Sequence, residues 1–241
     1  MAIRPGAIGQ DWNASRLEER IDGLLVSRRV SQYLADPGVA SCSSVGMIAP
    51  TTEGTLTTTG LAAFGATIFT STASVSGVSE GFGGWITGQV VQRRWLPDLH
   101  WNWGTSNKAN ARFWVGVFSA DPKAIVSPTG IQCIGLRYDD VTDNADTFIK
   151  LVTSNNSATP LVTSTGVAMD IGTITSRIRV RPWDLAVEVW INGRIVVVLP
   201  STETTLPTDS SSLMVAAKVT ALSTFSGTRV LRHGRMALAM T

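Results

Sequence analysis

Few residues of this chain have the chemistry of a general acid, base or nucleophile. Retaining cleavage of a glycoside requires two carboxyl groups about 5 Å apart. Glu188 is the central acid of the segment 184–191, and Trp190 stands where a second carboxylate on the same strand face would be. Asp184 lies four residues back, close to the start of the segment. We expect Glu188 to be an exposed strand residue or the partner of an arginine rather than a catalytic group.

Histidine and serine chemistry is equally poorly supported. The chain has two histidines, His100 and His233, and no Gly-x-Ser-x-Gly elbow accompanies them. His100 lies within an aromatic cluster, which favours a packed or hydrogen-bonded ring over a base. Phosphate loops and zinc spacings are also missing from the sequence. The sequence therefore predicts no catalytic residues and no cofactor, and a protein that is not an enzyme.

The one acidic cluster is the segment Asp139-Asp-Val-Thr-Asp-Asn-Ala-Asp146. Oxygen ligands at alternating positions are suited to calcium, but the glycine and terminal glutamate of an EF-hand loop are absent. Asx hydrogen bonding in a hairpin turn explains the composition adequately. We predict a turn without a metal site, and whether an ion binds there stays open at this level.

Three tryptophans, Trp95, Trp101 and Trp103, are close in sequence around a proline. Exposed indoles are good platforms for sugar rings, so these residues are candidates for glycan contact. Burial beneath a sheet edge is the alternative, and it is the commoner fate of tryptophan.

Three arginines, Arg177, Arg179 and Arg181, alternate with apolar residues and share one strand face. This stripe is a candidate contact for an anionic partner, either an acidic neighbour or an anionic glycan. A solvated outer face is the alternative. A site for single-stranded nucleic acid would need aromatics interleaved on this face, and the sequence has none there.

Composition bounds the class of protein. The chain has 241 residues, of which 44% are hydrophobic and 16% are charged, and its net charge is +2. It can bury a substantial core, and its charge gives no electrostatic reason to expect nucleic acid as a partner. Cys42 and Cys133 fit no metal spacing and are expected to be free, buried thiols. No signal-peptide pattern opens the sequence, and the longest strongly apolar run is 195–199, so we expect no membrane insertion.

The region after residue 88 consists of short β-branched runs separated by turn residues. Asn192-Gly193 is typical of a type I′ hairpin turn, and it joins the runs 184–191 and 194–199. Regular strands with such punctuation predict an all-β antiparallel sandwich. The expected strands are 89–95, 112–118, 131–138, 147–153, 176–181, 184–191, 194–199, 213–219 and 228–238.

Three segments are expected: an N-terminal attachment arm and helix over 1–38, a Thr/Ser/Gly-rich intermediate segment over 39–88, and the sandwich over 89–241. The helix begins at a capping box at Ser15 and ends at Asp36-Pro37. Its seam packs either on its own domain or in a bundle with copies of itself. The residues expected to serve attachment and oligomerisation are Trp12, Leu17, Ile21, Leu24 and Leu25. In the intermediate segment we expect short strands around 55–61 and 66–75 and a flexible loop over 77–84.

The segments 113–122, 135–138, 187–196 and 229–232 together resemble the concanavalin A-like jelly-roll domain. They are similar in particular to the version found in bacteriophage tail-fibre and virion-surface proteins. The resemblance implies two curved antiparallel sheets, a homotrimer, and attachment to other virion proteins through the N-terminal part. It implies a virion structural protein, most simply a tail fibre that contacts the host surface. A capsid decoration protein and a stand-alone carbohydrate-binding module are the alternatives.

Overall fold

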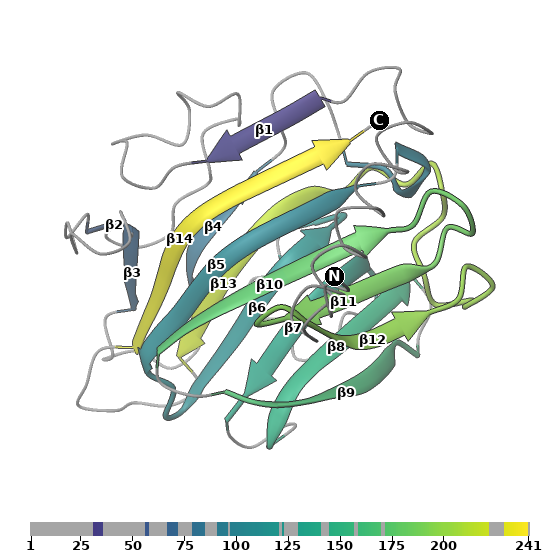
Figure 1. Cartoon of the computed structure of the whole chain (residues 1–241). Helices are drawn as coiled ribbons and strands as arrows, with labels where there is room; N and C mark the ends of the chain where they lie inside the picture. The colour runs from purple at the N-terminus through teal and green to yellow at the C-terminus, as the bar shows by residue number, and fades with distance from the viewer. Residues whose placement is uncertain are drawn as a thin grey trace, which may run out of the picture.

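The structure is a computed structural model of the whole chain (Figure 1). It describes residues 31–35, 56–57, 67–71, 79–84, 91–95, 97–120, 122, 130–140, 145–156, 159–169, 172–221 and 229–240. These residues form two antiparallel sheets that lie face to face, as Figure 1 shows. The predicted all-β sandwich of the concanavalin A-like jelly-roll type is therefore confirmed.

The first sheet has eight strands, and all of its pairs are antiparallel. Its order is β12 (Arg194–Leu199), β11 (Val187–Ile191), β10 (Gly172–Val180), β5 (Asp98–Asn107), β14 (Arg229–Met240), β3 (Thr67–Ser71) and β2 (Leu56–Thr57), with β1 (Ser31–Ala35) also paired to β14. The second sheet has six strands, in the order β4 (Ser79–Gly84), β13 (Met214–Ala221), β6 (Ala111–Phe118), β7 (Gln132–Asp139), β8 (Phe148–Asn155) and β9 (Leu161–Ala168).

The inner faces of the two sheets form the main hydrophobic core. Side chains alternate along each strand, so every second residue points inward. Among the residues packed there are Trp101 and Trp103 of β5, Phe113 of β6 and Val189 of β11. The indole N–H of Trp103 donates to the hydroxyl of Ser176 at 3.0 Å, which satisfies the one polar atom that this ring buries.

The β11–β12 hairpin turns as its sequence predicts. Asn192 and Gly193 both have positive φ, of 50° and 76°, the conformation that a type I′ turn requires. The two strands pair with one β-bulge after Val189. Val189 and Val197 thus stay on the core face, whereas Trp190 and Ile195 lie together on the outer face.

Several strand predictions need correction. Residues 31–35, assigned to the end of the N-terminal helix, form strand β1, and their backbone pairs with residues 236–240. The expected loop over 77–84 contains strand β4, which pairs with β13. Of the expected strand 89–95, residues 91–95 are described, and they form a single bridge at Val91 followed by a 3₁₀ turn, Arg93–Trp95. In each case backbone pairing with a distant strand, rather than local composition, decides the outcome.

Strands from the first two predicted segments belong to the same sheets as the predicted sandwich domain. β1, β2 and β3 extend the eight-stranded sheet, and β4 forms an edge of the other sheet. The short strands expected around 55–61 and 66–75 correspond to β2 and β3. The attachment residues Trp12, Leu17, Ile21, Leu24 and Leu25 lie outside the described residues, as does Cys42. The attachment role of those five therefore stays a prediction.

Candidate functional site

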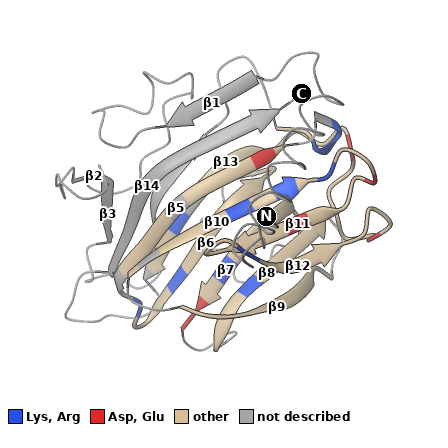
Figure 2. Cartoon of the chain, viewed as in Figure 1, with Lys and Arg blue, Asp and Glu red and all other residues tan. Residues whose placement is uncertain are grey.

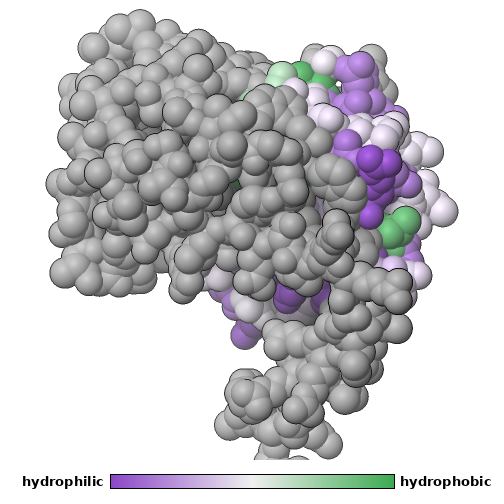
Figure 3. Space-filling view, turned by 90° about the horizontal axis from the view of Figure 1, so that it is seen from above, coloured by the Kyte–Doolittle hydropathy of each residue, from purple (hydrophilic) through white to green (hydrophobic). Residues whose placement is uncertain are grey.

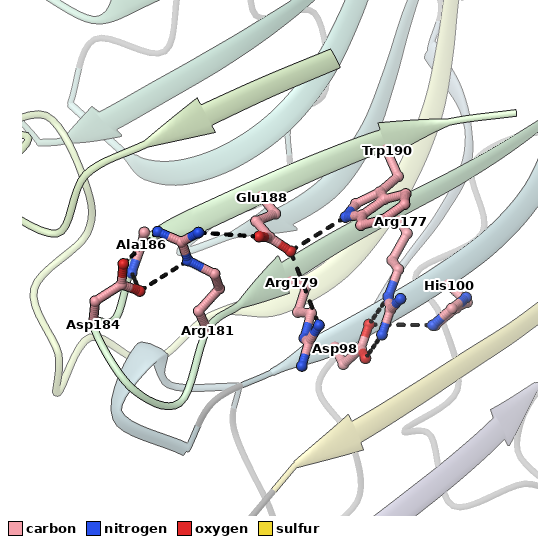
Figure 4. Close-up of polar contacts among 9 residues, drawn as sticks. All are labelled: Asp98, His100, Arg177, Arg179, Arg181, Asp184, Ala186, Glu188 and Trp190. Carbon is pink, nitrogen blue, oxygen red and sulfur yellow. Dashed lines mark hydrogen bonds and ion pairs between the residues drawn. The ribbon is translucent and has the colours of Figure 1, made fainter. Parts of the chain in front are cut away.

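The outer face of the eight-stranded sheet carries a continuous polar and aromatic network across β5, β10 and β11. Because the core face takes Leu99, Ile178 and Val189, the alternate residues of the same strands point away from the core. In Figure 2 the basic residues of β10 appear as blue segments within this sheet. We call this network the arginine–tryptophan face. Figure 4 draws its residues Asp98, His100, Arg177, Arg179, Arg181, Asp184, Glu188 and Trp190. Trp183 of the β10–β11 loop, which the figure does not draw, also belongs to it.

Asp98 and Arg177 form one end of this face. The Nε and Nη2 groups of Arg177 donate to the two oxygens of the Asp98 carboxylate at 2.8 and 2.5 Å. The imidazole Nε2 of His100 lies 3.2 Å from the same carboxylate. Desolvation raises the pKa of Asp98, but the hydrogen bonds and charges of Arg177 and His100 together hold it below its usual value. Asp98 is therefore ionised at neutral pH.

Glu188 is the centre of the network. Its register partner on β10 is Arg179, whose Nη1 lies 4.0 Å from Oε2. Arg181 donates from Nη1 to Oε1 at 3.3 Å, and the indole N–H of Trp190 donates to Oε2 at 3.4 Å. Glu188 is only 6% exposed, so its carboxyl group contacts these neighbours rather than bulk water. The prediction of an arginine partner is confirmed, and the prediction of an exposed residue is wrong.

A tight loop presents Trp183 and Asp184 at the other end. The amide of Leu185 donates to the carbonyl of Arg181 at 3.0 Å, and Leu185 takes a positive φ of 56°. The Asp184 carboxylate accepts the amide of Ala186 at 3.1 Å and both Nε and Nη2 of Arg181. Desolvation raises the pKa of Asp184, but these hydrogen bonds and the charge of Arg181 lower it overall.

Arginine side chains also lie against the two tryptophan rings. The guanidinium carbons of Arg179 and Arg181 lie 5.7 and 5.5 Å from the centroid of Trp183, and that of Arg177 lies 5.8 Å from the centroid of Trp190. These distances are in the range of cation–π attraction. Trp183 nevertheless remains 52% exposed. The neighbouring strand β12 adds two exposed apolar side chains, Ile195 and Val198.

This combination suits the recognition of sugars. Sugar rings offer an apolar C–H face that stacks on an indole, and hydroxyl groups that bond to planar charged side chains. The described surface seen in Figure 3 is mostly hydrophilic or neutral, with small isolated hydrophobic groups. Glu188 and Asp184 also bond to neighbouring nitrogens of Arg181, so two carboxylates meet at one guanidinium.

The structure separates the predicted site residues. Trp101 and Trp103 are each 1% exposed and belong to the core, so the prediction of glycan contact is wrong for both, and the alternative of burial holds. The side chain of Trp95 lies outside the described residues. Of the other aromatic residues, Trp183 has the exposed ring that the prediction sought.

The arginine stripe does share one face, as its alternation predicts. Its anionic neighbours are carboxylates of the same chain, Asp98, Asp184 and Glu188. The alternative of a fully solvated face does not describe Arg179, which is 7% exposed. Contact of the stripe with a separate anionic partner stays a prediction.

A second set of charged residues lies on the outer face of the six-stranded sheet, and it is buried. Arg112 pairs with Asp139 at 2.8 Å, and Arg137 forms two hydrogen bonds to Asp146 at 3.0 and 3.1 Å. Trp114 packs among them, with the Arg137 guanidinium 5.9 Å from its centroid. These residues are at most 6% exposed. Two carboxylates of the predicted acidic turn, Asp139 and Asp146, are thus paired with arginines of β6 and β7.

Among the described residues, no three His, Cys, Asp or Glu side chains are grouped to hold a metal ion. None of the helices formed by the described residues has the length and apolar character needed to cross a bilayer.

Comparison with known proteins gives the fold a context. No protein-family model matches the chain, and neither does any curated protein. Among solved structures, the apo Crh5 transglycosylase is similar with a TM-score of 0.59 and 12% identity, over 86% of this chain and 83% of that chain. A β-glucanase of Bacillus licheniformis is similar with a TM-score of 0.51 and 9% identity, over 88% of this chain and 98% of that chain. The carbohydrate esterase vb_24B_21 of the Shiga toxin-encoding bacteriophage phi24B is similar with a TM-score of 0.52 and 17% identity, over 88% of this chain and 100% of that chain.

These likenesses correct one prediction. The solved structures that share this jelly-roll fold include a transglycosylase and a glucanase, so the prediction that the chain is not an enzyme is contradicted. The relation of the fold to carbohydrate-active proteins is supported by the same structures.

Proposed function

We propose that this chain is a carbohydrate-active protein that binds a glycan on the arginine–tryptophan face of its eight-stranded sheet. The observation that carries the proposal is Trp183, a 52% exposed indole held against Arg179 and Arg181 at the tip of a closed loop. A ring that is already positioned loses little conformational entropy when a sugar stacks on it. The carboxylates and guanidinium groups beside it supply hydrogen bonds that orient the sugar.

Binding to immobilised and soluble polysaccharides tests this proposal. Affinity electrophoresis or calorimetry with the full chain should detect a complex that Trp183→Ala weakens by about tenfold or more, the effect of losing roughly 1.4 kcal/mol or more of binding free energy. Phe148→Ala is the matched control, since Phe148 is an exposed aromatic residue of the other sheet, 37% accessible. If both variants bind as the wild type does, the site is elsewhere.

Cleavage or transfer of the bound glycan is the second candidate, favoured by the two carboxylates that meet at Arg181. Glycoside cleavage uses a carboxylate pair on either side of the scissile bond. Arg181 helps to keep Asp184 ionised, which suits a nucleophile, a base or a stabiliser of positive charge. The assay is release of reducing ends or transfer products. Glu188→Gln should abolish this release, while Asp140→Asn, just after β7 of the other sheet, should leave it unchanged.

The bacteriophage context is a further part of the proposal. It rests on the sequence resemblance to virion-surface jelly rolls and on the likeness to the carbohydrate esterase of bacteriophage phi24B. In this setting the chain is a homotrimeric particle protein that contacts the host surface glycan. Light scattering of the full chain should give three times the chain mass, and a stable monomer would contradict this part alone.

A further inference from the structure

The three arginines of the arginine–tryptophan face are matched by three carboxylates of the same chain. Arg177 pairs with Asp98, Arg181 pairs with Asp184 and Glu188, and Arg179 lies within ion-pair distance of Glu188. The formal charges of these three arginines and three carboxylates sum to zero, and His100 is the one further titratable residue that Figure 4 draws. Consequently the network presents many hydrogen-bonding groups but little net charge.

Two of these pairs have the same geometry. Asp98 accepts from Nε and Nη2 of Arg177, and Asp184 accepts from Nε and Nη2 of Arg181. This two-pronged arrangement is the one by which arginine recognises a carboxylate, sulfate or phosphate of a ligand. Each aspartate therefore occupies the position that the anionic group of an acidic sugar would take.

The geometry points to Asp98 and Asp184 as the residues that set glycan specificity: they make the face accept uncharged glycans and exclude anionic ones. This inference rests on the proposed function, because it concerns the ligand of the same face. An anionic sugar must displace an aspartate from its arginine, and the displaced carboxylate then repels it at short range. Neither cost applies to an uncharged sugar.

An uncharged glycan can use the network as it stands. The carboxylate of Asp184 is partly exposed, with 41% of its side chain accessible, and its oxygens have lone pairs left for sugar hydroxyl groups. Trp183 lies next to it in the loop and offers its exposed ring for stacking. An uncharged glycan forms no ion pair with the protein, so the affinity of such a complex should depend little on salt concentration.

The test compares uncharged and anionic polysaccharides with the full chain. The uncharged probes are a soluble β-glucan, a xylan and a galactomannan; the anionic probes are alginate and polygalacturonate. Wild type should bind at least one uncharged probe, with a Kd that changes by less than about threefold between about 20 mM and about 500 mM NaCl. It should bind the anionic probes at least about tenfold more weakly.

Two variants reverse the preference if the inference is right. Asp98→Asn and Asp184→Asn each remove the carboxylate that forms the two-pronged pair with Arg177 or Arg181, while Arg181 keeps its contact with Glu188. Each variant should raise affinity for an anionic probe by about tenfold, an effect that salt weakens. Asp140→Asn is the control, because it removes the same charge from the end of the six-stranded sheet, where Asp140 bonds to Tyr138 and the amide of Asn110.

The outcomes separate the inference from the proposed function. Wild-type binding to an anionic probe that equals or exceeds binding to every uncharged probe overturns the inference and leaves the glycan-binding function standing. Gain of anionic binding in the Asp140→Asn control as large as in the other two variants also overturns it. Absence of binding to all five probes overturns the proposed function, and the inference falls with it. The wild-type comparison stands even if a variant does not fold.

Discussion

The guanidinium of Arg181 lies 5.5 Å from the ring centroid of Trp183, two positions along the chain, while both its Nε and Nη2 groups bond to Asp184. One arginine thus organises both the aromatic and the acidic side chain of the β10–β11 loop. Desolvation lowers the pKa of Arg181, but hydrogen bonding to Asp184, the largest influence, raises it overall, so the guanidinium stays charged. Because the loop is already positioned without a ligand, binding needs little rearrangement and loses little conformational entropy.

The buried pair between Arg112 and Asp139 should dominate the stability of the six-stranded sheet. Asp139→Asn removes the negative charge that lies 2.8 Å from the buried Arg112, and the expected loss in free energy of unfolding is about 3 to 5 kcal/mol. Denaturation by urea, followed by fluorescence, measures this loss. The pair between Arg93 and Asp209, whose carboxylate is half exposed, is the control, since Asp209→Asn should cost less, about 1 kcal/mol. Equal losses in the two variants would contradict the assignment.

Acid stability should depend on Asp98. Its pKa is lowered in the folded state relative to the usual value of 3.8, so its ionised form stabilises the fold above that value. This contribution is lost as pH falls from about 4 through the lower folded pKa. Urea midpoints should therefore drop less between pH 5 and pH 2.5 in Asp98→Asn than in wild type. If the urea midpoints of the two proteins fell equally between pH 5 and pH 2.5, Asp98 would contribute nothing to acid stability.

The thiol of Cys133 should be inert in the native protein. Burial raises its pKa to about 12, opposed by a hydrogen bond with the backbone of Ser154, and its side chain is fully inaccessible. Thiol reagents require the thiolate, so none should react at pH 8. In a Cys42→Ser background, a chromogenic disulfide reagent should titrate no thiol in buffer and one thiol in guanidinium. Prompt modification in buffer would place Cys133 at the surface.

Gly116 should tolerate no side chain. A Cβ atom there would lie 2.4 Å from the carbonyl oxygen of Ile134 and 2.7 Å from the Cα atom of Gly135, both backbone atoms of β7. Gly116→Ala must push β6 from β7, at an expected cost of about 1 to 3 kcal/mol or more. Gly172→Ala is a close control, since Gly172 has a similar φ, 146° against 156°, with nothing within 4 Å of its Cβ position. Since the two positions differ in crowding and only slightly in φ, Gly116→Ala should have the lower thermal midpoint of the two variants. Equal midpoints would refute the effect of crowding at Gly116.

Local sequence patterns predict the strands with the clearest alternation. β6, β7, β8 and β12 fall where their β-branched runs place them, and Asn192-Gly193 turns as expected. In contrast, β5 and β9 were not predicted. Residues 98–103 alternate strictly between polar and apolar side chains, as in a strand, but Pro97 and the aromatic cluster distract from this pattern. That alternation would have assigned Trp101 and Trp103 to the core and Asp98 and His100 to the outer face.

The network itself depends on strand register, which the sequence does not state. Asp98 and Arg177 are 79 positions apart, and only the pairing of β5 with β10 brings them together. The sequence pattern places Asp184 at the start of the expected strand 184–191, but β11 begins at Val187 and residues 182–184 form a turn. The left-handed Leu185 closes this turn, which brings Trp183 and Asp184 to the network. Tertiary pairing therefore supplied what periodicity alone could not.

The most direct test of the glycan-binding face is the affinity of Trp183→Ala for whichever polysaccharide the wild type binds. The account predicts a loss of about tenfold or more with an unchanged thermal midpoint, because the ring is half exposed and contributes little to the core. Phe148→Ala should retain wild-type affinity. Undiminished binding by a folded Trp183→Ala protein would contradict the account.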